Sequence, residues 1–96
     1  MNYNLSNLKP SDLRQFETDL ILDTARTEFV DRVVQFISYE DHSVANLDTV
    51  YCNGAMLGKC FAMLTKDERD RIMSVDTNRA RAFVDGLQGR EFSPEV

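Results

Sequence analysis

The 96-residue sequence has no tryptophan, one histidine, two prolines and two cysteines, and each of these scarcities narrows what the protein can be. The prolines lie near the two ends, at Pro10 and Pro94, so the interior lacks the strongest helix breaker. No run approaches the roughly 18 apolar residues of a membrane span, so we expect no membrane association. Residues 1–4 form no basic segment ahead of an apolar stretch, so we expect no secretory signal and a cytoplasmic protein.

The residues that several classes of enzyme need are also missing. His42 is the only histidine, so it can neither complete four zinc ligands with Cys52 and Cys60 nor form a recognisable catalytic pair. Gly54 and Gly58 lack the lysine and the serine or threonine that complete a phosphate-binding loop. We therefore expect no enzymatic activity, no metal and no cofactor, and the motifs identify no known family.

Negative charge predominates, with 16 acidic against 11 basic side chains and a net charge of −5. The excess lies in residues 1–48, with nine acids and four bases, whereas residues 49–96 hold seven of each. An acidic chain repels nucleic-acid phosphates, so direct nucleic-acid binding is the weaker alternative. Its candidate segment is 66–81, where acids are interleaved with five basic side chains: Lys66, Arg69, Arg71, Arg79 and Arg81.

Apolar spacing predicts two helices in the first half of the chain. Ser11 follows Pro10 and can cap a first helix over about residues 12–22. Residues 29–37 place their apolar side chains on one broad side of a second helix. A strand would need polar residues at alternate positions, which this segment lacks, so we favour the helix.

Capping signals predict two further helices after residue 64. Thr65 and Glu68 fit a capping box that starts a short helix over about residues 66–74. Either Asp76 or Thr77 then caps a last helix with a continuous apolar face. That helix is expected to stop at one of two glycines, Gly86 and Gly89.

The segment CNGAMLGKC, residues 52–60, has two interpretations. Asn53-Gly54 between apolar residues is typical of a hairpin turn, and this alternative stays open for residues 48–56. The residues after Gly54 favour a helix, in which Gly54 and Gly58 form a notch that packs against another helix. Cysteines eight residues apart in a helix are separated by about 12 Å, too far for a disulfide, so we expect free thiols.

The side of this helix opposite the glycines is the first candidate surface for a protein partner. Lys59 is the only charged residue between 49 and 65, and methionines suit adaptable binding surfaces. The alternative is that the helix is central in the bundle and this side is buried. The residues expected to project from it are Cys52, Met56, Lys59, Cys60 and Met63.

Acidic side chains in the first half form a second candidate surface. They could meet a basic groove on a partner, with a salt-dependent association rate. The residues proposed for this surface are Asp19, Asp23, Glu28 and Asp31.

Together, these patterns predict one all-α domain, a small bundle of four or five helices over residues 1–96, with 1–10 and 90–96 as loosely ordered ends. The predicted function is binding to a larger protein as its inhibitor or modulator. Small acidic proteins of this kind suit a bacteriophage or mobile-element accessory role directed at a host enzyme. The alternatives are a nucleic-acid-binding regulator that uses 66–81, and a non-catalytic subunit of an enzyme complex. A homo-oligomer is a further option.

Overall fold

A computed structural model of the chain describes residues 5, 8–22, 26–40 and 43–91. Within these residues there are five α-helices and no strand, which confirms the all-α prediction. The helices are α1 (Pro10–Ile21), α2 (Arg26–Ile37), α3 (Val44–Ala62), α4 (Lys66–Met73) and α5 (Asn78–Leu87). None of these helices is long and apolar enough to cross a membrane.

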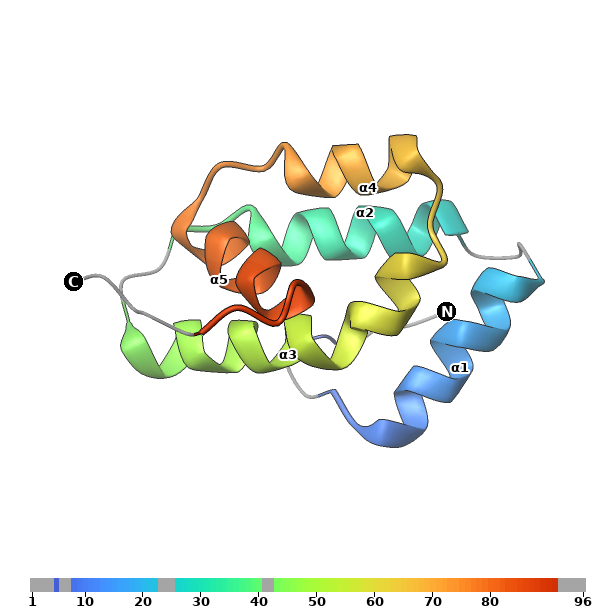
Figure 1. The fold of residues 1–96 in the computed structure, drawn as a ribbon, viewed down its shortest axis with the longest axis horizontal. Coiled ribbons are helices and arrows are strands. Elements are labelled where there is room, and N and C mark those ends of the chain that lie inside the picture. Colours follow the sequence, from blue (N-terminus) through green and yellow to red (C-terminus); the bar gives the residue numbers. More distant parts are fainter. Residues whose placement is uncertain (1–4, 6–7, 23–25, 41–42, 92–96) are drawn as a thin grey trace.

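The helices form a bundle in which α3 and α5 make the most extensive pairing. Figure 1 shows α2 and α4 side by side, α3 along the opposite side of the bundle, and α1 against the end of α3. The core between them contains fully buried side chains from four helices, namely Val33, Ile37, Val50, Leu57, Ile72 and Phe83. The apolar stripes that predicted α2 and α5 therefore face this common core.

The first helix begins two residues before the predicted start. Pro10 occupies its first turn, where the missing amide hydrogen costs nothing and the fixed φ angle suits a helix. The Asp12 carboxylate accepts a hydrogen bond from the backbone amide of Lys9 (3.0 Å). The expectation that Ser11 caps this helix is wrong, because Ser11 lies inside the first turn.

Both later capping predictions are confirmed. The Thr65 hydroxyl accepts a hydrogen bond from the Glu68 amide (3.2 Å), and the Glu68 carboxylate accepts one from the Thr65 amide (2.8 Å). Thr77, rather than Asp76, caps α5 by accepting from the Ala80 amide (2.9 Å). These bonds join residues three apart, so local sequence is enough to specify them.

The choice between hairpin and helix for residues 48–56 is settled, because they lie within the 19-residue helix α3. A methyl group built on Gly54 would overlap the Phe83 carbonyl oxygen of α5. The closest neighbour of a methyl group on Gly58 would be the Leu87 carbonyl oxygen, at an ordinary 3.6 Å. The expected notch therefore exists at Gly54, but Gly58 is not needed for close approach.

Gly86 of α5 is the second glycine at the contact between α3 and α5, and the sequence suggested it as the end of a helix. That expectation is wrong, because α5 continues to Leu87 and Gly86 is buried against α3. A methyl group on Gly86 would overlap the Tyr51 carbonyl oxygen and come within 2.8 Å of the Ala55 nitrogen. The helix ends at Leu87, and Gly89 lies just beyond the end, where its positive φ of 71° suits a glycine.

Polar side chains join the ends of helices that are distant in sequence. The Arg26 guanidinium donates to the carbonyl oxygens of Leu20 (3.1 Å) and Met63 (3.2 Å) and to the carboxylate of Glu68 (2.6 Å). Arg26 thus satisfies free carbonyls at the ends of α1 and α3 and also holds the start of α4. The Arg26 hydrogen bond keeps the pKa of the Glu68 carboxyl below its usual value, although partial burial opposes this.

The N-terminal segment also contributes to the core. Leu5 is buried, and its carbonyl oxygen accepts a hydrogen bond from the Asn53 side chain (2.6 Å), which is itself buried in α3. Pro10 belongs to α1. Leu5 and Pro10 therefore do not fit the expectation that residues 1–10 are loosely ordered. Most of the expected loose ends lies outside the described residues.

Candidate protein-binding surfaces

The long helix α3 has one side that no other described helix covers. A row of its exposed positions recurs at alternating spacings of three and four residues, and Val44, Asn46 and Thr49 are exposed beside it. We call this row the outer face of α3, and it consists of Ala45, Asp48, Cys52, Ala55, Lys59 and Ala62. Four of these six side chains are small and uncharged, and Lys59 is the only charged one after Asp48. The alternative interpretation required this side of α3 to be buried, and the helix is not buried on this side.

The residues predicted for this surface divide into two groups. Cys52 is exposed, and the Lys59 side chain is 77% exposed, 3.5 Å from the carboxylate of Glu17 on α1. Met56 and Met63 are half-buried, and Met63 packs against the core. The methionines thus border the outer face rather than forming its centre.

Cys60 is a correction to the predicted surface. Its side chain is 1% exposed, and burial together with the nearby Glu17 charge raises the pKa of its thiol to about 11. A thiol with that pKa stays protonated at neutral pH and reacts poorly. Cys52 and Cys60 both lie in α3, and their spacing along the helix is too great for a disulfide between them.

Exposed apolar side chains continue from α3 onto the end of α1. Ile21 is 72% exposed and Leu22 is 63% exposed. Ile21 follows Glu17 by four residues and so lies on the same side of α1. Because Glu17 pairs with Lys59, this side of α1 borders the outer face of α3.

The four acids proposed as a second surface do not form one continuous exposed surface. Asp19 is buried and accepts a hydrogen bond from the Gln15 side chain (3.0 Å), so it is not available to a partner. Glu28 is half-buried, and Asp31 is exposed but pairs with Arg71 (2.5 Å). The fourth acid, Asp23, lies outside the described residues, as does His42.

The basic residues of segment 66–81 are largely engaged within the chain. Three form ion pairs, namely Lys66 with Asp70 (2.7 Å), Arg71 with Asp31 (2.5 Å) and Arg81 with Asp76 (3.6 Å). Arg79 donates twice to the Phe36 carbonyl oxygen (2.9 and 2.7 Å), and its guanidinium lies 4.7 Å from the centre of the Phe36 ring. Ion pairs thus offset three of the five positive charges of this segment.

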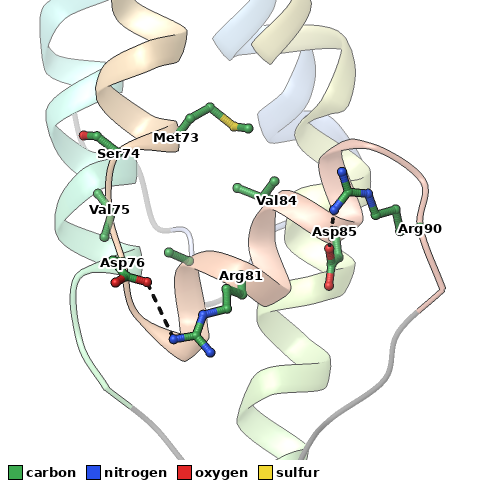
Figure 2. A pocket seen from close by; sticks show the side chains of 9 residues that line it. Met73, Ser74, Val75, Asp76, Arg81, Val84, Asp85 and Arg90 are labelled. Carbon is green, nitrogen blue, oxygen red and sulfur yellow. Dashed lines mark hydrogen bonds and ion pairs between the residues drawn. The ribbon is translucent and has the colours of Figure 1, made fainter.

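The structure also contains a cleft that the sequence did not indicate. It has a volume of about 470 Å³ and lies between the end of α4 and α5. Figure 2 shows Met73 and Val84 projecting into it from these two helices. Charged pairs lie at its rim, Arg81 with Asp76 (3.6 Å) and Arg90 with Asp85 (3.5 Å). No local pattern could reveal this cleft, because its two sides meet only in the folded chain.

Side chains that could together hold a metal ion do not converge in the part of the chain that is described. There, no three histidine, cysteine, aspartate or glutamate side chains gather around a common point. The chain matches no protein-family model, no curated protein and no solved structure. Function must therefore be argued from the surfaces of the bundle themselves.

Proposed function

We propose that the protein is a binding module that docks onto a larger protein through the outer face of α3 and inhibits or modulates it. One observation carries this proposal: between residues 49 and 62 this exposed face bears a single charge, on Lys59. An exposed helix face normally carries several charged side chains, as α2 does with Asp31 and Arg32. A face with so little charge loses little hydration free energy when a partner covers it.

The occupant that this face fits best is a helix of the partner protein. Spacings of three and four residues are those with which two helices pack along each other's length. The small side chains of Cys52, Ala55 and Ala62 allow the two backbones to approach closely. Met56, Met63 and Ile21 at the border supply apolar area, and methionine adapts to the shape of a partner.

We propose binding rather than catalysis because two side chains that could react, Cys60 and Glu68, have structural roles. Cys60 is a buried thiol, and the Glu68 carboxylate caps α4 and pairs with Arg26. The proposed setting is the cytoplasm, where an exposed thiol such as that of Cys52 stays reduced. A bacteriophage or mobile-element origin would make a host enzyme the natural partner.

The double variant Ala55→Glu with Ala62→Glu tests the proposal. Both positions are exposed and glutamate is a good helix former, so circular dichroism should show an unchanged fold. The matched control is Thr18→Glu with Gln35→Glu, which adds the same charge at exposed positions on α1 and α2. Each protein is immobilised and exposed to lysate, and the retained partner is then purified for titration.

Wild type and control should bind the purified partner equally and change its activity. The Ala55/Ala62 variant should bind at least about 100-fold more weakly, because each carboxylate buried without a partner costs several kcal/mol. Equal binding by all three proteins would exclude the outer face of α3. A partner that is inactive without the chain would make the chain an enzyme subunit, and salt-sensitive retention on DNA would favour the nucleic-acid alternative.

A further inference from the structure

The helix α4 is attached to the bundle by much less apolar contact than the other helices. Ile72 is its only buried residue, whereas α5 buries Ala80, Ala82, Phe83 and Gly86. The neighbour of α4 along its length is α2, as Figure 1 shows. A segment with few buried apolar groups opens at a lower free-energy cost than the core around it.

Two ion pairs also join α4 to α2. Glu68 of α4 pairs with Arg26 (2.6 Å), and Arg71 of α4 pairs with Asp31 (2.5 Å). The Arg71 and Asp31 side chains are about half exposed, at 50% and 52%, so salt screens their attraction. A cavity of about 210 Å³ lies between α2 and α4, and Val30, Glu68 and Arg71 are among the residues that line it.

The rest of the bundle is held together without α4. The α3–α5 crossing depends on the close approach at Gly54 and Gly86. Arg79 and Thr77 of the α5 start bond to the carbonyl oxygens of Phe36 and Ile37 at the end of α2. These contacts join α2, α3 and α5 directly, so separation of α4 from α2 does not require the other helices to part.

We propose that α4 opens away from α2 as a unit while the other four helices stay folded. Opening breaks both ion pairs, withdraws Ile72 from the core and exposes the apolar strip of α2 around Val30. The strip so uncovered is bordered by Arg26 and Asp31, one positive and one negative group. It is suited to an amphipathic partner helix that presents an apolar residue between an acid and a base, as α4 itself does.

Hydrogen exchange of the full-length protein tests the proposal. Amides within α4 should exchange at least about tenfold faster than core amides of α3 and α5. Raising the salt from about 0.01 M to about 1 M shortens the Debye length from about 30 to about 3 Å, and should accelerate α4 selectively. Exchange of all five helices at one common rate would overturn the proposal.

A matched pair of variants separates opening from fraying within α4. Arg71→Gln removes an ion pair to α2, whereas Lys66→Gln removes the pair with Asp70 inside α4. Arg71→Gln should accelerate exchange in α4 several-fold and leave α5 unchanged, and Lys66→Gln should have a much smaller effect. Equal acceleration by both variants, or acceleration of every helix by Arg71→Gln, contradicts the proposal.

Thiol labelling gives a second measurement, with a built-in reference. In a Val30→Cys, Cys52→Ser protein the new thiol lies behind α4, and Cys60 reports opening of the α3 core. Relative to the unfolded protein, the thiol at position 30 should be protected at least about tenfold less than Cys60. Equal protection of the two thiols would mean that they become accessible only by global unfolding, and the proposal would fail.

Discussion

Replacing Gly86 and Gly58 separately by alanine tests how α3 and α5 are held together. Both glycines lie in helices at the same interface, so both changes gain about 1 kcal/mol of helix propensity. They differ in the space available. The new methyl group at Gly86 would overlap α3 backbone atoms of Tyr51 and Ala55, whereas at Gly58 its nearest neighbour lies at 3.6 Å.

The predicted effects on stability therefore have opposite signs. Backbone atoms cannot rotate aside as a side chain can, so Gly86→Ala forces α5 away from α3 at a cost of about 3 kcal/mol. After the gain in propensity, Gly86→Ala should destabilise the protein by about 2 kcal/mol. Gly58→Ala keeps the propensity gain and should stabilise it by up to about 1 kcal/mol.

Urea and thermal unfolding followed by far-UV circular dichroism measure both effects. For a domain of this size, Gly86→Ala should lower Tm by about 10 °C and Gly58→Ala should raise it by about 5 °C. If Gly86→Ala is as stable as Gly58→Ala, the helices do not cross as closely as the structure indicates. The reasoning would also fail if Gly58→Ala were the more destabilising change.

Two further predictions concern single side chains. Cys52 should react with a thiol reagent in the native protein, whereas Cys60 should react only after denaturant is added; rapid labelling of both would contradict the burial of Cys60. Glu68→Gln should destabilise the protein by about 1 kcal/mol at neutral pH. Because the Arg26 hydrogen bond lowers the pKa of Glu68 in the folded state, the stabilisation is present above the usual glutamate pKa and is lost as pH falls through the folded pKa. Urea titrations of wild type and variant should thus converge as the pH falls below the folded-state pKa of Glu68, and a constant difference would refute the assignment.

Local chemistry made several elements predictable. The capping box at Thr65 and Glu68 and the Thr77 cap join residues three apart, so neighbours in the sequence specify them. The apolar stripe of α2 depends only on helical periodicity. The absence of an intrachain disulfide between Cys52 and Cys60 followed from helix rise once that segment was taken as helical.

The outer face of α3 was predictable only in part. The low charge of residues 49–65 is visible in the sequence, and Cys52 and Lys59 are exposed as expected. Periodicity alone could not place Cys60 in the core or half-bury Met56 and Met63, because their burial depends on how the rest of the chain packs around α3. Asp19 shows the same limit, since its burial depends on what packs against α1 in the folded chain.

The sequence by itself determined that this chain forms helices, where the later ones begin, and that one stretch carries almost no charge. These properties depend on backbone torsions and on contacts within about four residues. Only the tertiary structure distinguishes Gly89, which follows the end of α5, from Gly54 and Gly86, which let α3 and α5 approach closely. It also made Arg26 the junction of three helix ends, through bonds to Met63 and Glu68 that span 37 and 42 residues. Contacts over such distances exist only after the chain has folded, so no local pattern encodes them.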